Sequence, residues 1–279
     1  MLTLMSTLGL QYPTVEAHMS GLLKRLFLVL SIVLATGVLP QAQATDTYKP
    51  QVGQAGKDVV WVPSPQALVD TMLDMAKVTP QDLVMDLGSG DGRTVITAAK
   101  RGVRAIGVEY NPDMVSLSKN AAAAAGVSDR ATFVQADLFK TDLSKATVIT
   151  MFLLPTINLQ LRPTLLSLKP GTRVVSNTFH MDEWEPDAKT TLGPEGCTSW
   201  CTAMLWIIPA KAQGTWKTPQ GNLTITQTFQ MISGTLGSTP ITGKLTGDQI
   251  TFTAAATKYT GRVNGDTIQG SNWTASRIN

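Results

Sequence analysis

The chain has 279 residues and a mass of 29.8 kDa, which suits one large domain or two smaller ones. Its 43% hydrophobic content is that of a globular protein, and a formal net charge of +3 gives no indication of nucleic acid or of an acidic partner. With only two cysteines and two histidines in the sequence, the composition argues against a structural zinc site, and no metal is expected.

Residues 1–44 have the order of a secretory signal peptide. Lys24 and Arg25 precede an uncharged run over 26–39, and Ala42-Gln43-Ala44 follows as a cleavage site of the A-x-A type. The run is shorter than the roughly 20 residues that span a bilayer, so no stable transmembrane span is expected. We expect export to the periplasm, or membrane anchoring if the leader is not cleaved. Met19 is an alternative start.

The next segments are a linker and a first helix. Residues 45–60 are polar, contain Pro50, Gly53 and Gly56, and are predicted to be an extended linker. Apolar side chains at near-helical spacing predict a helix over 66–77.

Strand and helix patterns then alternate. Strands are expected at 83–86, 105–109, 131–136, 147–154 and 173–179, with helices at 94–100, 111–126 and 158–168, and an edge strand at 202–208. This alternation predicts a Rossmann-like α/β domain over residues 61–210, in which helices cover both faces of a parallel sheet. Ligands are expected at the carboxyl ends of its strands.

The composition changes after Pro209. Residues 211–279 are rich in threonine and glycine, with short alternating runs that predict a small all-β domain, an antiparallel meander. Its aromatic side chains are expected to form its core; they are Trp216, Phe229, Phe252 and Trp273. An envelope partner could bind this domain, but the sequence does not indicate its role.

A glycine-rich loop follows the strand at 83–86. Gly88, Gly90 and Gly92 occupy alternate positions before a helix, so backbone N–H groups can approach a ligand closely. The G-x-G-x-G spacing differs from the G-x-G-x-x-G of dinucleotide enzymes and from a phosphate loop. It favours a nucleoside with an amino-acid tail, such as S-adenosylmethionine.

Three carboxylates follow or end successive predicted strands. Glu109 offers two acceptor oxygens to a ribose diol, and Asp137 can accept from an adenine amino group beside Leu138. Asp86, beneath the glycine loop, can fix that loop or meet the ammonium of the cofactor. Together these acids and the loop indicate a cofactor site.

These residues resemble the motifs of class I S-adenosylmethionine-dependent methyltransferases. More closely, the chain between about Trp61 and Trp184 is similar to the small protein-lysine methyltransferases typified by the ATP synthase c-subunit lysine methyltransferase. The stretches that carry the likeness are Val62-Pro63-Ser64-Pro65-Gln66, Asp86-Leu87-Gly88-Ser89-Gly90-Asp91-Gly92-Arg93, Glu109-Tyr110-Asn111-Pro112, Asp137-Leu138-Phe139-Lys140-Thr141-Asp142-Leu143-Ser144 and Phe152-Leu153-Leu154-Pro155.

The resemblance implies methyl transfer from S-adenosylmethionine to an amine, either a protein lysine or a small amine. It implies that cofactor is bound by Asp86, Gly88, Ser89, Gly90, Gly92, Glu109, Tyr110, Asp137 and Leu138. It also implies that the acceptor pocket is lined by Trp61, Pro63, Phe152, Leu154 and Pro155. No catalytic base is assigned. His180 follows the strand at 173–179 and either faces the pocket or lies in a surface loop, and the surface loop is favoured.

Two questions stay open in the sequence. The leader and the β domain are additions to the family pattern, so an exported, non-catalytic nucleoside-binding protein of the envelope is the alternative function. Cys197 and Cys201 either form a local disulfide or remain two thiols.

Overall fold

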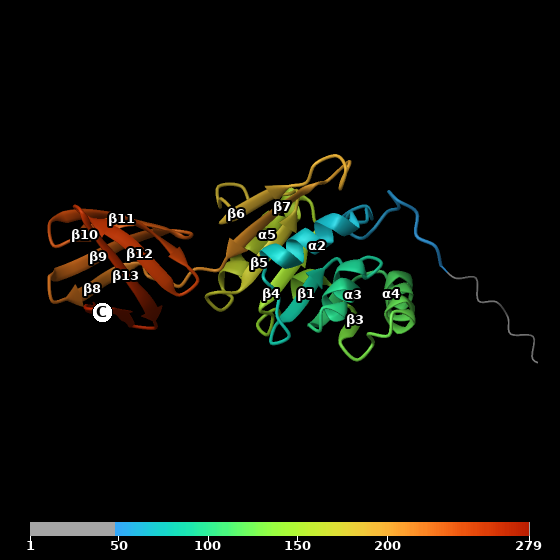
Figure 1. Cartoon of the computed structure of the whole chain (residues 1–279), viewed down its shortest axis with the longest axis horizontal. Coiled ribbons are helices and arrows are strands. Elements are labelled where there is room, and N and C mark those ends of the chain that lie inside the picture. The colour runs from blue at the N-terminus through green and yellow to red at the C-terminus, as the bar shows by residue number, and fades with distance from the viewer. Residues whose placement is uncertain (1–47, 279) are drawn as a thin grey trace, which may run out of the picture. The chain divides into compact units, whose positions relative to one another are not determined.

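The computed structural model describes residues 48–278, and the predicted leader lies outside this range. Within it, seven strands form one sheet and eight form a closed barrel (Figure 1). None of the helices in this part of the chain is long and apolar enough to cross a membrane.

The first part of the described chain alternates helices and strands. Its elements are α2 (Gln66–Met75), β1 (Leu83–Leu87), α3 (Arg93–Lys100), β2 (Arg104–Glu109), α4 (Pro112–Ala124), β3 (Ala131–Gln135), η1 (Leu138–Lys140), β4 (Val148–Met151), α5 (Pro155–Leu166), β5 (Arg173–Asn177), β6 (Ala188–Thr191) and β7 (Thr202–Ile207). The predicted elements are therefore present, but α5 starts at Pro155 rather than at residue 158. Proline suits the first turn of a helix because the backbone N–H groups of that turn have no acceptor within the helix, so the N–H that proline lacks is not missed.

The strands of the sheet follow the order β3-β2-β1-β4-β5-β7-β6. The first five are parallel, whereas β7 runs antiparallel to β5 and to β6. The predicted edge strand, β7, is thus an inner strand, and the edge is formed by β6, which the sequence analysis missed. All four residues of β6 are exposed, so no apolar alternation indicated it. Strand order changes direction between β1 and β4, where ligands bind in open α/β sheets.

Two apolar cores hold helices against the sheet. On one face, buried side chains of α2, α3 and α4 pack together with the strands, among them Leu68, Leu73 and Val95. On the other face, Leu161 and Leu165 of α5 pack in the second core. Helices therefore lie on both faces, as predicted.

The remaining strands form the barrel. They are β8 (Gly214–Thr218), β9 (Gly221–Thr228), β10 (Met231–Leu236), β11 (Thr239–Thr246), β12 (Gln249–Ala254), β13 (Thr257–Asn264), β14 (Thr267–Gly270) and β15 (Thr274–Ile278). Consecutive strands pair antiparallel, and β8 also pairs with β15, so the predicted meander closes on itself.

Three of the four aromatic residues expected in the barrel core are there. Trp216, Phe252 and Trp273 are buried in it. Phe229 is not, because it lies in the turn between β9 and β10 and stacks on Trp184, with ring centroids 5.7 Å apart. The alternation of apolar residues in the sequence does not indicate which aromatic residue lies outside the core of the barrel.

We expect Gly92→Ala to lower the free energy of unfolding more than Gly126→Ala. Both glycines have positive φ, +80° and +68°, and this conformation costs an alanine roughly 1–2 kcal/mol. A Cβ at Gly92 would lie 2.7 Å from the Phe133 ring and 2.9 Å from Ser118 Cβ, whereas at Gly126 no described atom lies within 4 Å. Overpacking adds about 1–3 kcal/mol at Gly92 alone. Urea denaturation measures both variants, and equal losses would contradict this account.

Candidate cofactor and acceptor site

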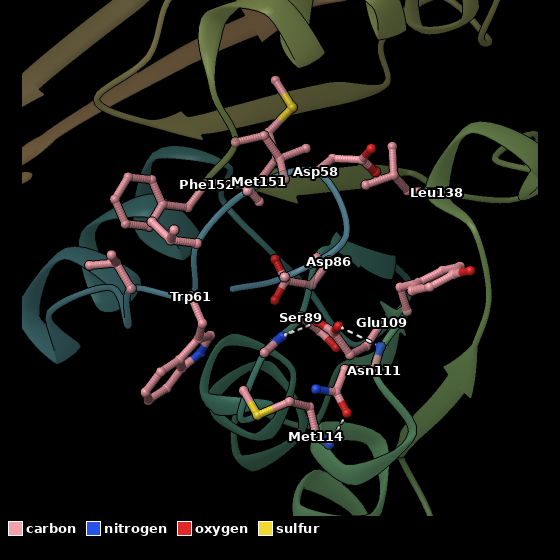
Figure 2. A pocket seen from close by; sticks show the side chains of 18 of the residues that line it. Asp58, Trp61, Asp86, Ser89, Glu109, Asn111, Met114, Leu138, Met151 and Phe152 are labelled. Carbon is pink, nitrogen blue, oxygen red and sulfur yellow. Dashed lines mark hydrogen bonds between the residues drawn. The ribbon is translucent and has the colours of Figure 1, made fainter. Parts of the chain in front are cut away.

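A pocket opens at the carboxyl ends of the parallel strands. It is lined by the ends of β1, β2 and β4 and by the segment 54–64, which precedes α2 (Figure 2). In Figure 2, Phe152 and Leu138 lie on opposite sides of this pocket, with Asp86 between them. The pocket therefore lies where the change in strand order predicts a ligand.

The glycine loop gives the pocket a floor made of backbone. Gly88 and Gly90 have φ of +73° and +54°, and a Cβ at Gly90 would lie 2.6 Å from Trp61 Nε1. Ser89 Oγ is buried and has no hydrogen-bond partner among residues 48–278. A Cβ at Gly107 would lie 2.6 Å from this oxygen, so the hydroxyl lies beneath the loop, and it is the side-chain-free backbone of Gly88 and Gly90 that a polar ligand can approach closely.

Gly92 differs from the other two glycines. It is the N-cap of α3 and does not line the pocket that the described residues form. Its missing side chain instead makes room for Phe133 and Ser118. Gly92 therefore has a packing role in the described residues, and its contact with the cofactor stays a prediction.

Glu109 holds the loop in place. Its Oε2 accepts from the Gly90 N–H at 2.9 Å, and its Oε1 accepts from the Asn111 N–H at 2.9 Å (Figure 2). Each carboxylate oxygen has a second acceptor site, so hydroxyl groups of a ribose can still donate to it.

Asp86 lies beneath the loop and is 6% exposed. Burial raises its pKa to about 7, helped by the negative charges of Asp91 and Glu109, although Thr150 Oγ1 donates to its Oδ1 at 2.7 Å. A carboxylate with this pKa changes charge near neutral pH.

Asp137 lies at the far end of the pocket and is already paired. Its Oδ1 accepts from the Phe139 N–H at 2.9 Å, and its Oδ2 lies 3.0 Å from Lys57 Nζ. The hydrogen bond with Lys57 lowers the pKa of Asp137, and the same bond raises the pKa of Lys57. Lys57 Nζ also lies 5.0 Å from the centroid of the Tyr110 ring.

The segment predicted as a linker is thus part of the site. Backbone hydrogen bonds between Gly53 and Trp61 and between Trp61 and Gln54, 2.8 and 2.9 Å long, fold it back on itself. Lys57 then lies against Asp137, across 80 residues of sequence. The polar composition of residues 45–60 did not indicate this contact.

The opposite end of the pocket is apolar. Trp61, Pro63, Phe152 and Leu154 line it, whereas Pro155 lies in the first turn of α5 and does not line the described pocket; that these residues meet the acceptor stays a prediction. Two aromatic residues absent from the sequence prediction join them, Phe179 after β5 and Trp200 before β7. Only the fold brings these residues to Phe152, because their strands are neighbours in the sheet.

Two further expectations concern the loops beyond β5. His180 does not line the described pocket, and its Nδ1 accepts from the Asp182 N–H at 2.9 Å, which places it in an exposed turn. Cys197 and Cys201 form a disulfide, so the question that the sequence left open is answered in favour of the bonded pair.

Comparison with known proteins agrees with this geometry. Residues 86–188 match the model of the ANTKMT methyltransferase domain. A protein-lysine N-methyltransferase of Saccharolobus islandicus is 47% identical over 46% of this chain and 81% of its own length. The human ATP synthase c-subunit lysine N-methyltransferase is 32% identical over 67% of this chain and 84% of its own.

A solved structure matches the same region. It is an RNA methyltransferase of Salinibacter ruber in complex with S-adenosyl-L-homocysteine, 47% identical, with a TM-score of 0.50 over 54% of this chain and 95% of that one. The glycine floor and the Glu109 carboxylate fit such a ligand. The chain therefore belongs to the class I S-adenosylmethionine-dependent methyltransferases, in the family of the lysine N-methyltransferases of the ATP synthase c-subunit and of the adenine nucleotide translocase.

Proposed function

We propose that the protein transfers a methyl group from S-adenosylmethionine to the ε-amino group of a lysine in another protein. The observation that supports this most directly is the division of one pocket into two ends. Asp86, Glu109, Asp137 and the backbone of the glycine loop lie at the end formed by β1, β2 and β3, and the aromatic rings of Phe152, Phe179 and Trp200 lie at the end beyond β4 and β5. The first end suits a nucleoside and the second suits an alkyl amine.

The roles of individual residues follow from this division. Glu109 is proposed to accept from the ribose, and Asp137 beside Leu138 to receive the adenine. Gly88, Ser89 and Gly90 are proposed to contact the methionine part, with Asp86 near its ammonium. Trp61 and Phe152 are proposed to line the path of the acceptor.

The cofactor supplies a methyl group already activated as a sulfonium, and transfer exchanges its S–C bond for an N–C bond. The protein must align the amine, and good alignment supplies roughly 7–11 kcal/mol of a reaction barrier. It must also favour the neutral amine, since lysine has a reference pKa of about 10.4. The apolar end of the pocket does this by desolvation, and the proton leaves to water; we assign no catalytic base.

The charge of the pocket supports a cationic acceptor. Five acids line it, Asp58, Asp86, Asp91, Glu109 and Asp137, against two bases, Lys57 and Arg93. Both bases are paired with acids of this set. The excess of carboxylates attracts a cation to the site before it loses its proton.

We also propose that the protein is exported. The pattern of residues 24–44 is that of a signal peptide, and a disulfide persists in an oxidising compartment. Fractionation of the source cells, with an antibody against the protein, tests this. Recovery in the cytosol with residues 1–44 attached would contradict export.

Methyl transfer is tested with the full chain and S-adenosylmethionine labelled in its methyl group, incubated with total protein and, separately, with total RNA. We expect label on lysine in protein and none after Glu109→Ala. The Salinibacter ruber relative makes RNA the competing acceptor, so labelled RNA with unlabelled protein would contradict the proposal. Cofactor binding without transfer to either would favour the non-catalytic alternative.

A further inference from the structure

Three aromatic rings meet at the acceptor end of the pocket. The centroids of Phe152 and Phe179 are 5.9 Å apart, and the Trp200 ring lies 5.9 Å from the first and 5.4 Å from the second. All three residues line the pocket, although they follow β4, follow β5 and precede β7. They form a continuous aromatic wall, which we define as Phe152, Phe179 and Trp200.

Phe152 and Phe179 of the aromatic wall are held in position by buried residues. Phe152 directly follows the buried strand β4. The carbonyl of Phe179 accepts from Ser176 Oγ at 2.7 Å and from Asn158 Nδ2 at 3.1 Å, and both donors belong to fully buried residues. The position of these rings is therefore set by the core.

Trp200 is held in another way. It lies in the loop between β6 and β7, one residue before Cys201, and the disulfide to Cys197 closes this part of the loop. Its φ is +58°, a conformation that a tryptophan adopts only when its surroundings impose it. Its side chain is 43% exposed, so one part faces solvent while another contacts the two phenylalanines.

The course of the chain brings this loop to the pocket. Because β7 is antiparallel to β5, the start of β7 lies beside the end of β5, with Asn177 opposite Ala203. The Thr178 N–H donates to the Thr202 carbonyl at 2.6 Å, and the Leu192 N–H donates to the Cys201 carbonyl at 2.9 Å. The disulfide thus fixes a loop whose end is already attached to the sheet.

We propose that Trp200, positioned by the Cys197–Cys201 disulfide, forms the outer wall of the channel that receives the acceptor lysine. The inference rests on the proposed function. The aliphatic part of lysine packs against aromatic carbon, and its nitrogen, while charged, is attracted to ring faces within about 6 Å. Trp200 therefore determines affinity for the acceptor and leaves affinity for the cofactor unchanged, because the nucleoside lies at the other end of the pocket.

The test uses a bisubstrate probe, S-adenosylhomocysteine with its sulfur replaced by a nitrogen that carries, through a two-carbon link, an amine with an n-butyl chain, so that this amine and chain stand for the ε-amine and the side chain of the acceptor lysine. Titration calorimetry with the full chain gives the Kd of this probe and of S-adenosylhomocysteine, and the Kd of S-adenosylhomocysteine divided by the Kd of the probe reports the gain in affinity from the arm. We expect Trp200→Ala to reduce this ratio about tenfold, Trp200→Phe to restore most of it, and neither to change the Kd of S-adenosylhomocysteine more than twofold.

A second variant separates the disulfide from the ring. Cys197→Ser with Cys201→Ser keeps Trp200 but releases the loop, and we expect a smaller reduction, about threefold, because only the ordering of the ring is lost. Met231→Ala is the control, since this side chain of the barrel is also exposed, at 54%, and does not line the described pocket. Thermal unfolding of each variant verifies its fold.

The results that would overturn the inference are distinct from those that would overturn the proposed function. An unchanged ratio in folded Trp200→Ala, or an arm that adds no affinity in the wild type, refutes the role of Trp200 while leaving the cofactor site intact. If the wild-type protein does not bind S-adenosylhomocysteine, the proposed function is refuted, and the proposed acceptor channel is refuted with it.

Discussion

Replacing Glu109 with alanine is expected to weaken S-adenosylmethionine binding by about 100-fold or more. The carboxylate now fixes the Gly90 and Asn111 N–H groups at 2.9 Å each, and its remaining acceptor sites face the pocket. Hydrogen bonds to a charged group contribute roughly 1.5–3 kcal/mol each, so losing two, together with the ordered loop, exceeds 2.7 kcal/mol. Titration calorimetry with S-adenosylmethionine and S-adenosylhomocysteine measures the change.

Glu195→Ala is a matched control for this experiment. Glu195 is exposed in the loop between β6 and β7 and does not line the described pocket. Its removal changes the net charge of the protein by the same amount as Glu109→Ala. A loss below threefold in Glu109→Ala, or an equal loss in both variants, would show that the carboxylate does not organise the cofactor site.

Asp86 is expected to make cofactor binding depend on pH near neutrality. Burial raises its pKa to about 7, so the group is largely neutral at pH 6 and largely charged at pH 8. Only the charged form offsets the positive charge of the cofactor. We expect affinity for S-adenosylmethionine to fall about tenfold from pH 8 to pH 6 and the profile of Asp86→Asn to be flat at the weaker value.

The same pKa predicts the opposite effect on stability. The folded state binds a proton more tightly than the unfolded state, whose carboxyl has a pKa of 3.8, so stability is greatest below that value and is lost as the pH rises through about 7. A shift of about three pKa units corresponds to roughly 4 kcal/mol. Asp86→Asn should therefore raise the free energy of unfolding by a few kcal/mol at pH 8 and change it little at pH 4, while it weakens cofactor binding.

Urea denaturation of wild type and Asp86→Asn at pH 4 and pH 8 measures this difference. Thr150→Val tests the binding profile separately. It removes the hydrogen bond that favours the charged form of Asp86, so the pH midpoint of S-adenosylmethionine binding should move upward. A stability difference independent of pH would mean that Asp86 is charged throughout this range.

The cofactor end of the site could be predicted from sequence because its signals are local. A buried strand, three glycines and the carboxylates at the ends of the next two strands occur in fixed order, and the parallel sheet brings them to one edge. Gly92 shows the limit of this reasoning. Its spacing equals that of Gly88 and Gly90, but it makes room for Phe133, a contact that the loop sequence does not contain.

The acceptor end could be predicted only in part, because it depends on long-range pairing. Phe179 and Trp200 reach Phe152 because β7 inserts between β5 and an exposed edge strand with no apolar pattern. Lys57 reaches Asp137 through a segment without regular structure. In both cases a segment that is polar or lacks regular structure brings a residue to the pocket. Hydrophobic periodicity gives no information about the position of such segments.

Closure of the barrel determines how other molecules can recognise it. Between residues 214 and 278 every strand is hydrogen-bonded to a neighbour on each side, including β8, which joins β15 to β9. A peptide therefore cannot be captured by adding a strand at an open edge, as happens in many β modules. A partner of this domain must instead contact its outward-facing side chains and turns. Substitutions of these surface residues should therefore change binding of the partner without lowering the stability of the barrel.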